Sequence, residues 1–452
     1  MTRTSKFILW LLCGLALLVI SFIVWRVNLA HDVDAKLQAI RAAGLPTNGK
    51  ELNAYYPAVP DNENAALVMI QAFELMRNYP DDRSNEVASF NIPPRGQSLS
   101  TEQKKLLSDY VEMNTDALAK ASEAIKLSQS RYPIDFSAGV ETEFPHLMPL
   151  KNLVKAAEFK ALLELESGHL TNADIAIKNI LGIANTLDNE PEMMSWLVRN
   201  TSIGRATTML ERRLNADVLT DQELNEFSAG LASVEGTNLL KRAVIALRAN
   251  RIPYFRMTWS QLRQINEANG DSTDGMPDSE RQPFLFWVSG WHDCDLRFFL
   301  KIMNTNVAVT GLPPPQNIIA YRNFDFEKIA KTIKRYHFNL SAMFLPELSS
   351  SVRVENKGFA QIRSATAALA VEHFRLAHGQ LPENMNELVP QFLPTVPSDP
   401  FDGAPLRYHR LAKGYVIYSV GRDGHDDGGR EKPADWKSSD KTTYDITFTV
   451  ER

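Results

Sequence analysis

The sequence predicts a multidomain α+β protein: an N-terminal transmembrane helix, a mostly α-helical middle, and a small C-terminal α+β domain with an antiparallel sheet. Three observations lead to this fold class. Residues 7–25 form an uncharged apolar run, and the middle of the chain repeats apolar residues at helical spacing. Residues 351–452 contain short segments of period-two alternation between turns rich in Gly and Pro.

The composition fits several folded domains and excludes some classes of function. The chain has 452 residues, and its 49 Lys and Arg against 54 Asp and Glu give a formal net charge of -5. So mild a balance gives no electrostatic reason to expect nucleic acid as a partner. The two cysteines, Cys13 and Cys294, exclude a scaffold built on disulfides.

Residues 7–25 (FILWLLCGLALLVISFIVW) are expected to form a transmembrane anchor that contacts the lipid bilayer. A helix of this length spans roughly 28 Å, close to the hydrocarbon thickness. Arg3 and Lys6 precede the run, so the positive-inside rule places residues 1–6 in the cytoplasm. We therefore expect a single-pass protein of the bacterial inner membrane, with the bulk of the chain periplasmic or otherwise extracytoplasmic.

Three processed forms of this segment are alternatives. A lipoprotein requires a small residue immediately before the modified cysteine, and Leu12 precedes Cys13. A cleaved signal peptide requires small residues just before the cut, and Asn28 and Ala30 make a poor site. A pilin-type leader requires Gly before the apolar run and Glu at its fifth position, where this chain has Lys6 and Leu11. The sequence favours an anchor that is not cleaved.

Residues 26–60 are expected to form a stalk with one short helical patch at 33–43, followed by a helical domain over residues 61–266. Apolar residues three and four apart predict helices near 65–76, 150–165, 171–187 and 191–214. Thr171 and Asp174 form a weak capping pair, and Thr220 and Glu223 form a clearer capping box.

Short turns between these amphipathic helices predict antiparallel hairpins, arranged as a bundle or a solenoid. The pair over 150–187 resembles a tetratricopeptide hairpin, although the chain has no 34-residue period. Residues 267–282 (EANGDSTDGMPDSERQ) are expected to be a flexible linker or loop. A helical extension over 283–350 and a hinge near 346–351 are expected before the last domain.

The C-terminal domain, residues 351–452, carries the most specific pattern. It predicts a helix over 355–377, strands at 406–409, 415–419 and 444–450, and an acidic, Gly-rich loop between the last two strands. The segments "PSDPFDGAPLRY", "YVIYSVGRDGHDDGG" and "ADW" follow one another in this order. Over residues 355–436 the chain resembles the C-terminal domain of the major pseudopilin of bacterial type II secretion systems.

This resemblance implies a structural calcium ion in the acidic loop. Carried over by motif, Asp423 and Asp435 are the expected ligands, and Asp426, Asp427 and Ser419 are further candidates. Calcium prefers six to eight oxygen ligands on a flexible loop, which suits this segment. The alternative is a solvated acidic turn. Because more than 300 residues separate the anchor from this domain, we expect a borrowed domain and not a filament subunit.

No familiar catalytic motif for metal hydrolysis, nucleophilic attack or phosphate binding is present. His292 and Cys294 lie close in sequence but on different helix faces, which favours a buried helix over a metal site. The first hypothesis is therefore a non-catalytic, membrane-anchored protein that binds or scaffolds an envelope protein partner. The alternatives are an accessory component of a type II secretion or pilus-like machine, and an envelope hydrolase with an unrecognised site.

Overall fold

The computed structural model describes residues 3–79, 84–236, 238–268, 288–433, 436 and 442–452, and the rest of this account concerns those residues. The expected linker at 267–282 therefore lies almost entirely outside them. The described chain is mostly helical, with one small sheet near the C-terminus. Its α-helices are α1 (Arg3–Ala42), α2 (Gly49–Tyr55), α3 (Ala65–Leu75), α4 (Ser84–Ser89), α5 (Thr101–Met113), α6 (Thr115–Ala124), α7 (Leu147–Glu166), α8 (Leu170–Asn185), α9 (Met193–Ala216), α10 (Asp221–Val234), α11 (Leu239–Arg251), α12 (Trp259–Ala268), α14 (Trp291–Thr310), α15 (Gln316–Arg322), α16 (Phe326–Tyr336), α17 (Asn339–Phe344) and α18 (Ser349–His378).

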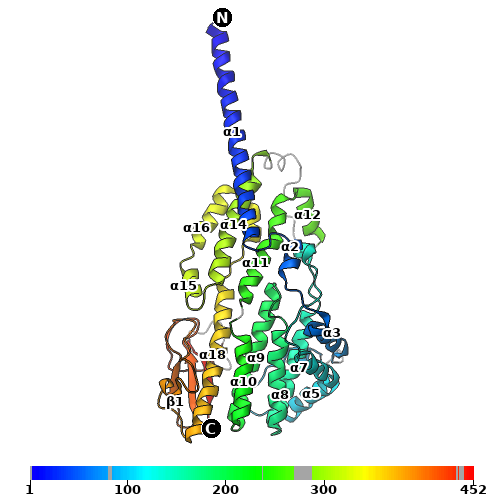
Figure 1. Cartoon of the computed structure of the whole chain (residues 1–452), viewed down its shortest axis with the longest axis vertical. Coiled ribbons are helices and arrows are strands. Elements are labelled where there is room, and N and C mark those ends of the chain that lie inside the picture. Colours follow the sequence, from blue (N-terminus) through cyan, green and yellow to red (C-terminus); the bar gives the residue numbers. More distant parts are fainter. Residues whose placement is uncertain (1–2, 80–83, 237, 269–287, 434–435, 437–441) are drawn as a thin grey trace.

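The first helix is longer than the apolar run. Figure 1 shows α1 projecting from one end of an elongated body, with the C-terminus at the other end. No Gly or Pro interrupts residues 15–42, so the helix continues beyond the apolar run instead of ending in a stalk with a separate patch. Val33, Leu37 and Ile40 recur at helical spacing and are buried against the body, which explains why this half of α1 is packed.

The middle of the chain is helical, as the sequence predicts. α7 packs on α8, α8 on α9, and α3 on α6. The capping box at the start of α10 is confirmed, with the Thr220 hydroxyl accepting from the Glu223 amide and the Glu223 carboxylate accepting from the Thr220 amide. The capping pair expected at Thr171 and Asp174 is wrong, because α8 begins at Leu170 and Asp174 is buried against Arg213 instead.

Three hydrophobic cores lie in the described part of the body, and α18 contributes to the two larger ones; the smallest consists of Leu52, Tyr56, Phe136 and Ala246. The first, which we call the α1-side core, joins the second half of α1 to α11, α14, α15 and the first part of α18. The second, the sheet-side core, joins α3 and α5–α10 to the last part of α18 and the sheet. The C-terminal region thus shares its core with the helical middle across the long helix α18 (Figure 1).

The sheet has three antiparallel strands in the order β1 (Arg407–Arg410), β2 (Tyr415–Ser419) and β3 (Ile446–Val450). These strands confirm the three predicted ones to within two residues at each end. In register, Tyr408 and Phe448 lie on either side of Ile417. The central strand β2 is buried along its whole length because α18 packs against one face of the sheet and the loop at Gly429 lies against Val416 and Tyr418 on the other.

Candidate functional site

The structure describes four of the five residues proposed as metal ligands, one at the end of β2 and three in the loop that follows, and it does not bring these four to one point. Ser419 ends β2, Asp423 is exposed, and Asp426 and Asp427 follow. Asp435 lies outside the described residues. Among those that are described, no three His, Cys, Asp or Glu side chains are arranged to hold a metal ion.

Ser419 belongs to a saturated hydrogen-bond network around a carboxylate that the sequence analysis did not select. The Ser419 hydroxyl donates to Asp399 Oδ1 at 2.8 Å, and the Val420 amide donates to Asp399 Oδ2 at 2.9 Å. Arg407 Nη1 also donates to Asp399 Oδ2, at 2.7 Å. Because Asp399 is fully buried and satisfied by these donors, it fixes the end of β2 to β1, and the Ser419 hydroxyl is already committed.

Asp423 and Asp426 are likewise occupied by local contacts. Asp423 Oδ1 accepts from the His425 amide at 3.1 Å, which closes a turn. Asp426 Oδ1 accepts from the Gly428 amide at 2.9 Å and from the Tyr418 hydroxyl at 3.1 Å. The Gly428 hydrogen bond holds the pKa of Asp426 below its usual value. Both contacts are those of a tightly folded acidic turn.

Asp427 and Asp445 lie next to each other in the buried part of the loop, where the Asp427 amide donates to Asp445 Oδ1 at 3.4 Å. The Thr443 hydroxyl donates to Asp427 Oδ1 at 2.7 Å, whereas the buried Oδ2 atom has no hydrogen-bond partner. Asp445, which is 2% exposed, accepts from the Gly429 amide at 2.7 Å. Burial raises the pKa of Asp445, and the negative charges of Asp427 and Asp426 raise it further. A cation between Asp427 and Asp445 would relieve this repulsion.

The close approach of the loop to β2 requires glycine at position 429. Gly429 has φ of 78°, and a Cβ atom there would lie 3.1 Å from the Tyr418 ring and 3.2 Å from the Val416 side chain. The amide of this residue is the donor to Asp445. The fold therefore positions Asp445 through a backbone conformation that only glycine adopts readily. Asp445 has no local sequence pattern that marks it, which is why sequence reasoning missed it.

A second polar cluster, in the helical body, combines a serine, a glutamate and a histidine. The Ser195 hydroxyl and His146 Nε2 both bond Glu190 Oε1, with the histidine at 3.0 Å. All three side chains are buried, and the His146 ring stacks on Tyr132 with 4.1 Å between centroids. Because the serine bonds the carboxylate and not the imidazole, the geometry differs from that of an activated nucleophile. The cluster joins α8 and α9 to the segment before α7.

A cleft of about 670 Å³ lies in the helical body between α7 and α9. Met148, Met194 and Leu197 line it with large exposed apolar side chains. Its charged lining residues, within the described part of the chain, are Lys151, Lys155 and Arg205. Burial lowers the pKa of Lys155, and the nearby Arg205 charge lowers it further.

Comparison with family models, with curated proteins and with solved structures finds no match to this chain. The fold and sequence define a mostly helical protein with a small C-terminal antiparallel sheet and one N-terminal helix long and apolar enough to cross a membrane. The apolar window of that helix is wholly unburied. A membrane anchor and a signal sequence share this length and composition.

Proposed function

We propose that the chain is a membrane-anchored, extracytoplasmic binding or scaffolding protein of the bacterial cell envelope, without catalytic activity. The observation that carries this proposal is α1. Its apolar part is unburied, and the same unbroken helix continues into the α1-side core. A segment removed by a signal peptidase after Ala30 would leave only the buried part of this helix behind. The continuity therefore supports an anchor that stays attached to the body.

Charge around α1 supports the orientation. Arg3 and Lys6 precede the apolar run, which favours a cytoplasmic N-terminus. On the other side, Arg26 pairs with Asp293 of α14 at 2.7 Å. Arg256 also contacts Asp293, at 3.3 Å, so the body balances part of the positive charge at the end of the run. This arrangement supports placing the body outside the cytoplasm.

The cleft between α7 and α9 supports the binding part of the proposal. Exposed methionines adapt to differently shaped apolar surfaces. Lys151 and Lys155 give the cleft positive charge on a chain of net charge -5, whereas Arg205 is paired with Glu158. The matching partner is a protein segment that carries apolar and acidic side chains. Neither this cleft nor the Ser195 cluster gathers the groups that the hydrolase alternative requires.

Membrane extraction and terminal sequencing test the anchor. We expect the full chain to remain in membranes washed with alkaline carbonate, with its N-terminus ahead of Phe7. Replacing Leu15 and Leu18 with Arg should release it, since each central Arg costs roughly 2.5–3.5 kcal/mol of insertion, whereas Ala at the same two positions is the matched control. A mature N-terminus after Ala30 would contradict the anchor.

Site-specific photo-crosslinking in intact cells tests the binding cleft. A crosslinking residue at Met194, which is 54% exposed, should capture one partner, and the same residue at Val218, 50% exposed, is the control. Lys151→Glu should abolish the crosslink because it removes the charge complementarity, while Lys413→Glu makes the same charge change elsewhere. Equal crosslinking from Met194 and Val218, or no effect of Lys151→Glu, would refute a specific acidic partner.

We also propose that the last helix and the sheet form a pseudopilin-like module stabilised by one structural Ca²⁺. The unpartnered Asp427 Oδ2 atom and the repelling Asp445 carboxylate support this proposal, with the Thr443 hydroxyl alongside. These residues would hold the ion, which would neutralise the two carboxylates and brace the loop against β2. Ser419 and Asp426 are bound by other partners and are not included.

A further inference from the structure

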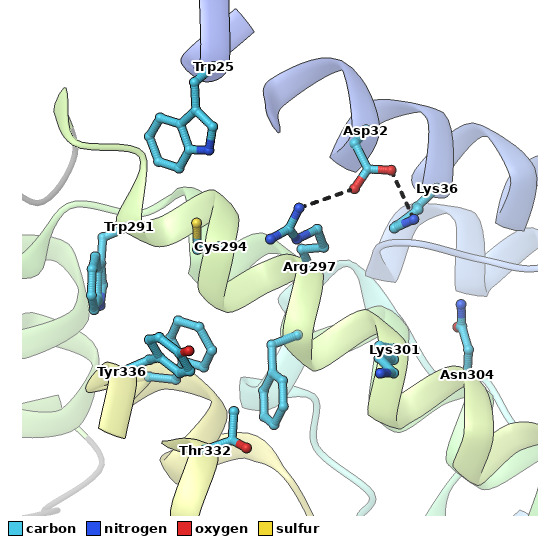
Figure 2. A pocket seen from close by; sticks show the side chains of 12 residues that line it. Trp25, Asp32, Lys36, Trp291, Cys294, Arg297, Lys301, Asn304, Thr332 and Tyr336 are labelled. Atoms are coloured by element: carbon cyan, nitrogen blue, oxygen red, sulfur yellow. Dashed lines mark ion pairs between the residues drawn. The ribbon is translucent and has the colours of Figure 1, made fainter. Parts of the chain in front are cut away.

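A cavity of about 980 Å³ lies where α1 enters the body, between α1, α14 and α16. Figure 2 shows Trp25 and Trp291 on one side of it and Arg297 and Lys301 on α14. The lining combines aromatic rings with cations, which suits an amphipathic ligand.

Positive charge exceeds negative charge in this cavity. Its charged lining residues are Lys36, Arg297, Lys301 and a single carboxylate, Asp32. Asp32 Oδ1 lies 3.0 Å from Lys36 Nζ, and Asp32 Oδ2 lies 3.9 Å from Arg297 Nη1 (Figure 2). No described carboxylate forms an ion pair with the exposed Lys301. The cavity therefore presents two cationic side chains, Arg297 and Lys301, that one shared carboxylate does not neutralise.

The cavity is held at the end of the apolar run. Trp25 is the last residue of that run, and at 1.5 Å per residue Asp32 lies roughly 10 Å beyond it along α1. The headgroup layer is roughly 5–8 Å deep on each side of the hydrocarbon core. The Arg26–Asp293 ion pair fixes α1 to α14, and Arg256 also contacts Asp293, at 3.3 Å. The cavity therefore begins at the edge of the hydrocarbon core, at Trp25, and extends across the headgroup layer to the level of Asp32, just beyond it.

We propose that this cavity binds the headgroup of an anionic phospholipid from the leaflet that faces the body. Arg297 and Lys301 hold the phosphate, and Trp25 and Phe298 contact the glycerol and the first methylene groups of the acyl chains. The site rests on the proposed membrane anchor. A free phosphate ion would leave the aromatic wall of the cavity without a contact, and a neutral apolar molecule would leave its uncompensated cations without a partner. An anionic phospholipid is the ligand that uses both.

Native mass spectrometry of the full chain in a neutral detergent tests the ligand. The probe is dihexanoyl phosphatidylglycerol, with dihexanoyl phosphatidylcholine and glycerol 3-phosphate in parallel. Removing both cations with Arg297→Gln and Lys301→Gln should weaken phosphatidylglycerol binding about 30-fold, since each cation near a headgroup is worth about 1 kcal/mol. The matched control is Lys328→Gln with Lys334→Gln, which removes two exposed charges from α16 outside this cavity, and should change binding by less than about threefold.

Cys294 supplies a readout inside the site. It lines the cavity and is partly exposed, and in a Cys13→Ser variant it is the one remaining thiol. In nanodiscs, phosphatidylglycerol should slow its reaction with N-ethylmaleimide several-fold compared with phosphatidylcholine alone. The Arg297→Gln and Lys301→Gln substitutions should remove this protection, which separates occupancy of the cavity from the general effect of a charged bilayer.

Three results would overturn the inference: equal affinity for the two lipids, equal affinity for glycerol 3-phosphate and phosphatidylglycerol, or protection of Cys294 that persists without the two cations. The first indicates a site that ignores charge, and the second indicates a phosphate-ester site that ignores the lipid. If the chain still resists carbonate extraction in these cases, the membrane anchor stands and only the lipid site fails. A mature chain that begins after Ala30 would remove the anchor instead.

Discussion

The contact between the helical body and the sheet depends on the protonation of one glutamate, which gives a sharp prediction. Glu211 of α9 accepts from the Thr449 amide of β3 at 2.7 Å and lies 3.1 Å from Arg95 Nη1. Asn215, one turn further along α9, accepts from the Glu451 amide at 2.8 Å and donates to the Thr449 carbonyl. Together the two side chains cover the outer edge of β3.

Burial raises the pKa of Glu211 from 4.5 to about 7 in spite of Arg95. The folded state therefore binds a proton more tightly than the unfolded state does. The resulting stability is fully present below pH 4.5 and is lost as the pH rises through about 7. A shift of about 2.5 pH units corresponds to roughly 3.4 kcal/mol, and we expect about 2–3 kcal/mol because the side chain keeps some solvent contact.

The substitution Glu211→Gln fixes the side chain in a neutral form that still accepts from Thr449. We expect the variant to unfold with nearly the wild-type free energy at pH 5, and to be about 2 kcal/mol more stable than wild type at pH 8.5. Urea unfolding of the full chain in detergent, followed by far-ultraviolet circular dichroism, measures both values. Comparing the two proteins at each pH cancels the contributions of Asp295 and Glu355, whose pKa values burial raises to about 6 and about 8.

The exposed Glu102→Gln substitution on α5 is the control, and it should leave the pH dependence unchanged. The reasoning is refuted if Glu211→Gln shows the same dependence on pH as wild type. It is also refuted if the variant is equally destabilised at both pH values, since Glu211 would then act only through its charge on Arg95. In either case the edge of β3 would not be linked to protonation.

Three further predictions concern the acidic loop, a buried ion pair and a helix cap. Calcium at 100 times its dissociation constant should stabilise the full chain by about 2.7 kcal/mol, compared with the chain in a chelator. In thermal unfolding, Asp427→Asn should abolish this gain and Asp423→Asn should keep it. The opposite pattern would place the ion on Asp423. Asp174→Ala should cost roughly 3 kcal/mol in urea unfolding because it strands the buried Arg213, and a loss below about 1 kcal/mol would argue against a buried pair. Thr220→Ala should cost about 1 kcal/mol by removing the N-cap of α10, whereas Thr171→Ala, at a position without a capping role, should be nearly neutral by the same measurement.

Local chemistry made parts of this structure predictable. The box at Thr220 and Glu223 involves residues three apart, so the chain needs only one helical turn to form it. The strand 415–419 was predicted correctly because a run of aromatic and β-branched residues, Tyr415 to Tyr418, is followed closely by the turn residue Gly421. The Thr171 and Asp174 pair has the same spacing as a box but is not one, because burial of Asp174 against Arg213 is a contact with another helix.

The candidate site shows the limit of sequence reasoning more clearly. The acidic residues 423, 426 and 427 are easily recognised in the sequence. The sequence does not tell which of them keeps a carboxylate oxygen free to bind a metal ion. Asp445 reaches the loop only because β3 pairs with β2, and Ser419 is committed only because Asp399 comes to the end of β2 from 20 residues away. His146 and Glu190 are likewise joined by a hydrogen bond that folding brings about, since 44 residues separate them in sequence.

By itself, the sequence determined the helical character of the middle, the three strands and the apolar length of the first helix, because periodicity, turn residues and hydropathy act over a few neighbouring residues. Tertiary structure alone decided that α1 continues into a core, that α18 joins two cores, and that Trp25 and Arg297 line the same cavity. Each of these depends on which surfaces pack together. Packing joins residues that are distant in sequence, and no local pattern records that choice.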